Sequence, residues 1–462
     1  MKVTLLLLLF GVYACQTVTD TRSVSDHLAT EVTRIDTVSH TLNLHSKAAV
    51  TRFYAQRELA LFWSSGGQLL AVADSLLATL RQASSYGLLP RDYHVEQLDI
   101  LLIDSTAQDR IQRLDVLLSD AYFTFCHHLK QGRLDRETLQ LRDHSRHIDP
   151  EAIASLQELS KGSLSGTLAR LEPAHDHYHN LKRVLMEAVM NPDRDSVQEN
   201  RILTLSLNLE RWRWEKQWPD RYVVVNIPSF LLRVIEADSI WLESRVVVGK
   251  RTTPTPVMES VIKSFLIYPY WHVPHSISTK EILPDLQRDA SYLQRNNFQV
   301  LNKKGDVILP DTIQWDRYSA DHFPFTLRQR EGSENSMGII KFNFANRYGV
   351  YLHDTNSKRL YAQARRDFSH GCVRVEKAVS LAHYLVHEDD IYVSPEDLDQ
   401  YLSLQQRLKI DLRKPIPLKL VYFTAEVRDG VPIFYEDIYK KDSVMTRALY
   451  PPAIETAFMP AF

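Results

Sequence analysis

The stretch that decides the fold runs from Tyr222 to Val248 and reads YVVVNIPSFLLRVIEADSIWLESRVVV. Three runs within it are rich in β-branched and aromatic residues: 222–227, 230–235 and 240–248. Short runs of this kind, separated by polar turns, are typical of successive antiparallel strands. The apolar spacing changes from helical to extended just after Pro219, so a mostly antiparallel β domain is predicted to begin at about residue 220.

Downstream, the strand pattern returns at 261–270, 339–344, 348–353 and 418–424. The segment from about residue 276 to residue 330 breaks this pattern with charges and helical pieces, and it is predicted to form a partly helical insertion that caps the sheet. The β domain is therefore predicted to span 220–395. The remaining segment, 396–462, is predicted to pack on the helical region that precedes the domain.

Upstream, apolar residues recur at helical spacing from about Lys47 to Met190 and again from Ile202 to Trp218. The chain has 462 residues, which is enough for two or three domains. The predicted organisation is a tether at 16–45, a helical scaffold at 46–219 and then the β domain. The fold class is α+β.

The overall composition and net charge indicate which classes of binding partner can be expected. Hydrophobic residues make up 44% of the chain, charged residues 24%, and the formal net charge is −2. This is globular composition, and it gives no reason to expect nucleic acid as a partner. The tryptophans are scattered and form no aromatic and basic stripe.

The N-terminus resembles an export signal. Lys2 precedes the apolar run Val3–Phe10, and small residues lead to Cys15. A cysteine at this place resembles the lipobox of bacterial lipoproteins, although Tyr13 is larger than the residue usually found there. The prediction is a signal peptide at 1–15, lipidation of Cys15 and a membrane-anchored protein of the periplasm or cell envelope. The alternative is a signal peptide that is cleaved elsewhere, with Cys15 discarded.

Cys15, Cys126 and Cys372 are the three cysteines of the chain, too few for a disulfide framework in an exported protein of this length. Cys126 follows an apolar helical stretch, so it is predicted to be buried and inert. Cys372 lies in the motif FSHGCVRVE, residues 368–376. Gly371 allows a sharp turn or a close approach to substrate.

The neighbours of Cys372 predict a reactive thiol. His370 and Arg374 flank it, and either could favour the thiolate. Helical spacing begins after Glu376, so Cys372 is also expected near a helix N-terminus, which stabilises negative charge.

A second motif ends the predicted strand 348–353 with His353, 19 positions before Cys372. A cysteine nucleophile needs a base, and histidine is the usual one. Tyr351 is expected on the same face of the strand as His353, where it either contacts substrate or packs.

Together, SHGCVR (369–374) and the upstream His353 resemble the signature of the L,D-transpeptidase catalytic domain, called YkuD. Further blocks are similar to the large YcbB-type subgroup: NLERWRW (208–214), NIP (226–228), VVGK (247–250), YPYWHVP (268–274) and KEILP (280–284). One departure is that Met190–Arg201 replaces the small peptidoglycan-binding domain common in that subgroup, and it is too short to be a domain.

The resemblance implies an enzyme that joins stem peptides of peptidoglycan. Cys372 would attack the carbonyl of the third residue of a donor tetrapeptide, release D-alanine and form a thioester. The amine of a neighbouring stem would then accept the acyl group. His353 would exchange the protons, and the resemblance also implies acylation by carbapenems.

Several other residues are expected around Cys372. The backbone N–H groups of Gly371 and Cys372 are expected to bind the oxyanion. His370, Ser369 and Arg374 are expected to shape the site, with an ion pair favoured for Arg374. Trp271 is expected either to line the substrate cleft or to pack in the core.

Two other functions remain open. The same thioester could be hydrolysed, which would make the protein an L,D-carboxypeptidase or an endopeptidase. The chain could instead be a wall-binding envelope lipoprotein without activity. A papain-like protease lacks support, because the Cys-Gly-x-Cys-Trp context is missing. No cofactor is expected, and the histidines at 175–179 are expected to form a surface loop without a metal.

Overall fold

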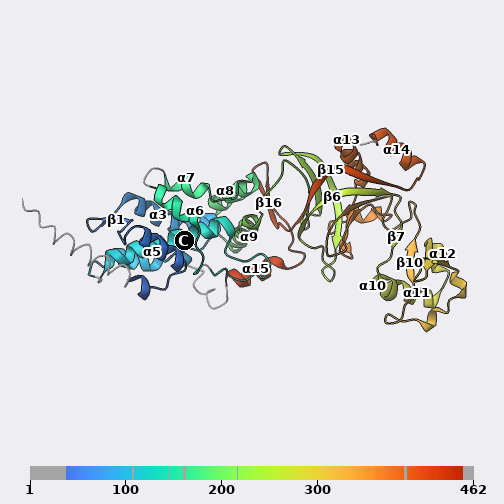
Figure 1. The fold of residues 1–462 in the computed structure, drawn as a ribbon, viewed down its shortest axis with the longest axis horizontal. Coiled ribbons are helices and arrows are strands. Elements are labelled where there is room, and N and C mark those ends of the chain that lie inside the picture. Colours follow the sequence, from blue (N-terminus) through green and yellow to red (C-terminus); the bar gives the residue numbers. More distant parts are fainter. Residues whose placement is uncertain are drawn as a thin grey trace, which may run out of the picture. The chain divides into compact units, whose positions relative to one another are not determined.

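The computed structural model describes residues 38–106, 109–143, 145–159, 163–215, 217–389 and 393–450 (Figure 1). The chain divides into two compact units. The first unit comprises Met1–Asp135 and Gln140–Pro173, and the second comprises Arg136–Leu139 and Ala174–Phe462.

The first unit is helical and is built around α5 (Arg110–Gln131), which is buried along most of its length. Its other helices are α2 (Lys47–Gln56), α3 (Ala71–Arg81), α4 (Val95–Ile103), α6 (Pro150–Glu158) and α7 (Leu164–Ala169), with a short hairpin of β1 (Ser64–Ser65) and β2 (Gln68–Leu69). Asp115 on α5 is fully buried and accepts hydrogen bonds from Tyr54, the backbone of Phe62 and Trp63, and Ser64. A buried carboxylate bonded in this way ties the preceding loop to the helix.

The second unit begins with the helix pair α8 (Asp176–Met190) and α9 (Ser196–Trp214), joined by residues 191–195. A capping box between Asp195 and Gln198 starts α9. Trp212 stacks on Phe423 with ring centroids 4.6 Å apart, so the pair packs on the C-terminal segment in this unit. These two helices, predicted as part of the scaffold 46–219, thus belong to the same compact unit as the β domain.

The β domain is a nine-stranded, mostly antiparallel sheet in the order β13-β5-β14-β12-β11-β6-β15-β3-β4, closed by pairing of β4 with β5. This confirms the predicted α+β class. Its strands are β3 (Arg221–Asn226), β4 (Leu231–Glu236), β5 (Ser239–Gly249), β6 (Met258–Ile267), β11 (Ile340–Phe344), β12 (Leu352–His353), β13 (Asp367–Ser369), β14 (Val373–Val375) and β15 (Leu408–Val421). Alternate residues of these strands fill the interior, together with the buried face of α13 (Ala378–Asp389).

Two strands differ from their predicted lengths. β12 covers only the end of the expected run 348–353, because Asn346 bonds the backbone of Val350 at both its N–H and its carbonyl and so holds a loop there. β15 begins ten residues before the predicted start at 418, and it pairs with both β6 and β3. The sequence pattern missed this extension because charged and proline residues interrupt it.

The insertion forms a small cap with its own core. Its sheet has the order β7-β10-β8-β9, made of β7 (Trp271–His272), β8 (Phe298–Leu301), β9 (Val307–Ile308) and β10 (Thr326–Gln329). The helices α10 (His275–Ile277), α11 (Leu283–Arg288) and α12 (Tyr292–Arg295), with a π-helical turn at Ser278–Ile282, complete it. The predicted capping insertion is therefore present and partly helical.

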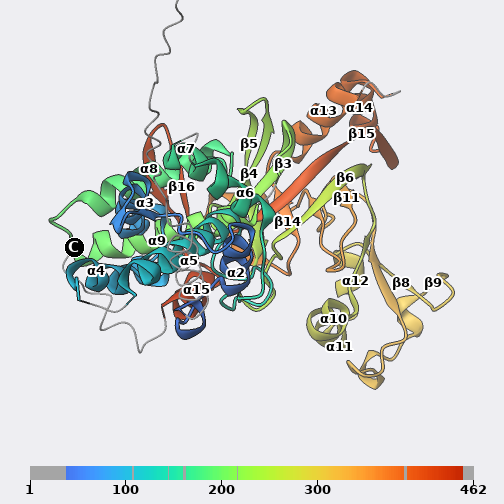
Figure 2. The same cartoon turned by 60° about the vertical axis from the view of Figure 1, so that its left-hand side comes forward.

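The C-terminal segment returns to the rest of the second unit. α14 (Pro395–Ser403) follows α13, and both lie beside β15 in Figure 2. Beyond β15, a hairpin of β16 (Ala425–Arg428) and β17 (Val431–Phe434) and the helix α15 (Lys441–Leu449) pack against α8 and α9. This return brings Tyr439 to Gly249 and Thr255, which lie beside the turn that carries Cys372.

Candidate active site

Cys372 lies at the end of a tight turn between β13 and β14. Gly371, at φ +115°, adopts a backbone conformation that side-chain-bearing residues rarely reach. Ser369 Oγ accepts the Gly371 N–H at 3.1 Å and donates to the Cys372 carbonyl at 2.5 Å. One buried serine therefore closes the turn from both sides of the glycine.

A second loop supports this turn from behind. Thr255 Oγ1 donates to the Gly371 carbonyl at 2.8 Å and accepts the Gly249 N–H at 2.8 Å. A side chain at Gly249 would collide with the backbone of Thr253 and Thr255, so a glycine is needed for this close approach. The VVGK block noted in the sequence thus ends where the nucleophile turn is braced.

Tyr439, from the C-terminal segment, completes the support. Its hydroxyl donates to the Gly249 carbonyl at 2.6 Å and accepts the Thr255 N–H at 3.1 Å. Tyr439 could not be predicted from the sequence pattern, since it lies 67 positions after Cys372 and belongs to no recognisable motif.

The pairing of β12 with β14 places the predicted catalytic residues on one face of the sheet. The strands are parallel, with Leu352 opposite Val373 and His353 opposite Arg374, and the Val373 N–H donates to the Tyr351 carbonyl at 2.9 Å. Leu352 and Val373 point into the buried interior. Because side chains alternate along a strand, Tyr351, His353, Cys372 and Arg374 share the opposite face.

His353 is held in one tautomer. Its Nδ1–H donates to the Asp354 carbonyl at 2.5 Å, which leaves Nε2 with the lone pair when the ring is neutral. Burial lowers the pKa of His353 to about 3, and the positive charge of Arg374 contributes to this. His353 is therefore a neutral imidazole at physiological pH and can accept a proton at Nε2.

The thiol of Cys372 differs from the sequence-based expectation. Burial raises its pKa, and this effect exceeds the opposing effects of hydrogen bonding from the Tyr351 backbone and of the charges of Lys341 and Arg374. The expected helix N-terminus is also absent at this place in the described chain, because β14 follows Cys372 and α13 begins only at Ala378. The resting pair is thus a neutral thiol beside a neutral imidazole, and no hydrogen bond joins these two described side chains.

Lys341 is a site residue that the sequence analysis missed. It lies on β11 directly opposite His353, on the same face of the sheet, and its Nζ is 3.8 Å from the centroid of the Tyr351 ring. Its charge acts on the pKa of both His353 and Cys372. The run 339–344 was predicted as a strand, but only the pairing of β11 with β12 brings Lys341 to the site.

Three further residues were predicted at the site: His370, Trp271 and Arg374. The structure places the first two in contact with the cap. His370 is exposed, and its Nε2 lies 2.6 Å from Glu281 Oε1 of the cap. Trp271 is partly buried against the cap core, with its ring 6.1 Å from that of Phe298. Arg374 forms no ion pair within the part of the chain that the structure describes, and its buried Nε has no hydrogen-bond acceptor there.

The expected oxyanion donors are not equivalent. The Gly371 N–H is already used by Ser369 Oγ, so it is not free to bind an oxyanion in this conformation. Within the described chain, no backbone acceptor is seen for the Cys372 N–H. Gly371 was predicted as a donor, and in this conformation the Ser369 hydroxyl accepts its N–H instead.

Cys126 is buried on α5, as predicted, and burial raises the pKa of its thiol. Among the described residues, no group of three or more His, Cys, Asp and Glu side chains could hold a metal ion.

His175 was expected in a surface loop, but it lies at the start of a helix. It caps α8 by accepting the His177 N–H at 3.2 Å and packs 4.6 Å from the Trp212 ring, and burial lowers its pKa to about 4.

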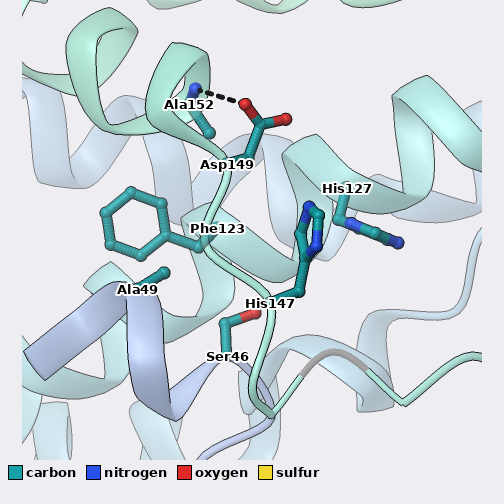
Figure 3. A pocket seen from close by; sticks show the side chains of 7 residues that line it. All are labelled: Ser46, Ala49, Phe123, His127, His147, Asp149 and Ala152. Carbon is teal, nitrogen blue, oxygen red and sulfur yellow. Dashed lines mark hydrogen bonds between the residues drawn. The ribbon is translucent and has the colours of Figure 1, made fainter. Parts of the chain in front are cut away.

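A small pocket lies in the first unit (Figure 3). Its lining residues are distant in the sequence from Cys372 and His353. It is lined by Ser46, Ala49, Phe123, His127, His147, Asp149 and Ala152. Asp149 is occupied as the N-cap of α6, where it accepts the Glu151 and Ala152 N–H groups. The pocket is therefore explained by helix capping and packing.

Among the helices of the described segments, none combines the length and the hydropathy that a membrane span requires.

Two family models and one curated relative match this chain. The model of the L,D-transpeptidase catalytic domain, YkuD, matches residues 220–393, and the model of the Scaffold domain matches residues 48–185. A Haemophilus influenzae protein named "Putative L,D-transpeptidase" is 28% identical over 415 residues, which is 88% of this chain and 81% of that protein.

Two solved structures are also similar to this chain. The catalytic domain of the E. faecium L,D-transpeptidase acylated by ertapenem is 13% identical, with a TM-score of 0.22 and coverage of 44% of this chain and 99% of that one. An L,D-transpeptidase from Mycobacterium smegmatis is 13% identical, with a TM-score of 0.20 and coverage of 44% and 58%.

Proposed function

Given that residues 220–393 form an L,D-transpeptidase catalytic domain of the YkuD type, with a scaffold domain before it, we propose that this chain cross-links the third residues of peptidoglycan stem peptides through a thioester on Cys372. The observation that carries the proposal is the shared sheet face of Cys372 and His353, with the Nδ1–H of His353 held by the Asp354 carbonyl. That arrangement leaves Nε2 as a proton acceptor on the face of the sheet that carries the thiol.

The first half-reaction is an acyl transfer to sulfur. His353 Nε2 takes the thiol proton as the sulfur attacks the carbonyl of the third residue of a tetrapeptide donor. The C–N bond to the terminal D-alanine then breaks, and His353 returns the proton to the leaving amine. Because the pair rests neutral, proton transfer accompanies attack and no preformed ion pair is required.

The second half-reaction transfers the acyl group to an amine. The free amine of a neighbouring stem attacks the thioester, His353 accepts its proton, and the sulfur leaves and is reprotonated. One amide is exchanged for another, so no nucleotide is consumed. The Cys372 N–H is the backbone group available to stabilise the oxyanion in both steps.

Two alternatives keep part of this chemistry. Water could replace the acceptor amine, which would make the protein an L,D-carboxypeptidase or an endopeptidase. A wall-binding lipoprotein would not use the thiol at all. The ordered tautomer of His353 and the braced turn at Gly371 support a working nucleophile over a passive binding site.

Intact-mass spectrometry with defined muropeptides tests the proposal. We expect a donor tetrapeptide to leave on Cys372 an adduct equal to the donor minus D-alanine, and a second stem to convert it to a cross-linked dimer. Cys372→Ala should form no adduct, whereas Cys126→Ala should react like the wild type, because Cys126 is buried in the other unit. Formation of free tripeptide without dimer would favour hydrolysis, and the absence of any adduct would favour the binding protein.

We also propose that Cys15, which lies outside the described residues, carries a lipid that anchors the protein in the cell envelope. The support for this is the apolar run Val3–Phe10 and the lipobox-like context of Cys15.

A further inference from the structure

Lys341 is a cation on the active-site face whose charge the described protein leaves uncompensated. It lies opposite His353 on the neighbouring strand, and its side chain is half-buried. The Tyr351 ring, 3.8 Å from Nζ, holds the ammonium group in place by a cation–π contact. The ammonium group is therefore positioned, and it faces the same space as the thiol.

Carboxylates near the site pair with other cations. Asp354 pairs with Lys358 and accepts the Ile339 N–H, Glu376 pairs with Arg245, and Glu281 bonds His370. Among the residues that the structure describes, none forms an ion pair with Lys341 or with Arg374.

Two partly buried cations without an anion are costly to the fold. Burial lowers the pKa of both Lys341 and Arg374, which reflects this cost. The cost is recovered if an anion enters the site with the substrate, since a charge-assisted hydrogen bond in a desolvated site is strong.

We propose that Lys341, supported by the Tyr351 ring, binds the free carboxylate of the residue that leaves the acyl donor, so that it selects donors ending one residue beyond the attacked carbonyl. This inference rests on the proposed function for the identity of the donor. The ammonium group anchors the leaving residue, while Cys372 and His353 act on the bond before it. Lys341 is a specificity-determining residue in this scheme, and it transfers no proton.

The test compares two donors that differ only at the terminus, a tetrapeptide acid and its C-terminal amide, by the rate of Cys372 acylation. The wild type should prefer the acid by about tenfold or more, the usual size for a lost charge-assisted bond. Lys341→Met should lose this preference, so that its acid-to-amide rate ratio falls toward one even if the rate with the amide also changes, and Lys341→Arg should recover part of it. The matched control is Lys263→Met, which removes an exposed lysine from β6 of the same sheet.

Three outcomes would overturn the inference: no preference in the wild type, equal slowing of both donors in Lys341→Met, or a preference that follows the carboxylate on the side chain of the third residue. The last is checked with donors that carry lysine in place of the diamino acid. Equal slowing would mean that Lys341 only supports the fold or the thiol.

A second arm separates this inference from the proposed function. Cys372 is alkylated with anionic iodoacetate and with neutral iodoacetamide, and the ratio of the two rates is compared with that of free cysteine. The iodoacetate-to-iodoacetamide rate ratio should be raised in the wild type and should fall in Lys341→Met. A change in the pKa of the thiol affects both reagents alike, so it cancels in this ratio. If no peptide acylates Cys372 but this ratio behaves as expected, the transpeptidase proposal fails and the anion site at Lys341 stands. An unchanged ratio overturns the anion site.

Discussion

At the scale of single residues, burial determines the chemistry of the site. The sequence motif around Cys372 suggested a thiolate, because His370 and Arg374 flank it. In the fold, His370 bonds Glu281 of the cap, and desolvation raises the pKa of the thiol despite two nearby cations. In the proposed mechanism, His353 is therefore needed as a base at the moment of attack.

Carbapenem acylation tests the pairing of these two residues. Ring opening by Cys372 gives a thioester like the proposed intermediate, so we expect a stable adduct on Cys372 in the wild type and none in Cys372→Ala. His353→Ala should slow adduct formation by about a hundredfold or more, because the base that takes the thiol proton is lost. Peptide mapping of the adduct is the measurement. Labelling of Cys126, or labelling that is unchanged in His353→Ala, would indicate non-specific thiol chemistry.

The pH dependence of acylation tests the neutral resting pair. His353 has a pKa of about 3 and becomes protonated only below that value, so lowering the pH from about 8 to about 5 leaves the base competent. The second-order rate constant for acylation should therefore show no inflection near the ordinary histidine pKa. A tenfold loss per pH unit below about 6.5 would contradict this account and favour a histidine of ordinary pKa.

At the scale of elements, the nucleophile turn is held by segments that are distant in sequence. The loop 250–255 and Tyr439 brace Gly249 and Gly371 through a short chain of hydrogen bonds. Strand pairing then aligns the turn with β12 and β11. The position of the sulfur thus depends on the tail of the chain as well as on the motif around Cys372.

Replacing Tyr439 tests this dependence. Tyr439→Phe removes a donor to the Gly249 carbonyl and an acceptor for the Thr255 N–H, so we expect a stability loss of about 1–2 kcal/mol. Acylation of Cys372 should slow by about tenfold, because a displaced nucleophile reacts poorly. The control is Tyr435→Phe, which breaks a bond to Glu426 on the same segment. Reduced thermal stability with an unchanged acylation rate would mean that Tyr439 supports the fold alone.

At the scale of the whole molecule, a helical unit and a unit that contains the L,D-transpeptidase catalytic domain share one chain. The family models divide the chain similarly, with a scaffold match at 48–185 and a catalytic match at 220–393. The short link 191–195 between α8 and α9 leaves no room for a further domain at that point.

Lipid labelling tests the anchoring of the chain. A fatty-acid probe fed to expressing cells should label the wild type and should leave Cys15→Ala unlabelled, because lipidation needs the cysteine thiol at the end of the apolar run. Fractionation should move the variant out of the membrane fraction. Equal labelling of both proteins, or labelling of neither, would rule out an anchor at Cys15.

Local patterns in the sequence predicted the order of elements, a mostly antiparallel β domain and the pair Cys372 and His353. Alternating β-branched runs such as 222–227 specify strands wherever they occur, and the glycine and histidine around the two motifs are recognisable without the fold. The cap was predicted for a similar reason, since residues 276–330 break the strand pattern. These features depend on neighbours along the chain.

Only the tertiary structure decided the chemistry of the site. The pairing of β11 with β12 places Lys341 opposite His353, Tyr439 bonds Gly249 from the C-terminal segment, and the Gly371 N–H is bonded to Ser369 Oγ. The directions of the pKa shifts of His353 and Cys372 also follow from burial. Desolvation and charge act through space, so the sequence order of these groups could not reveal which of them meet.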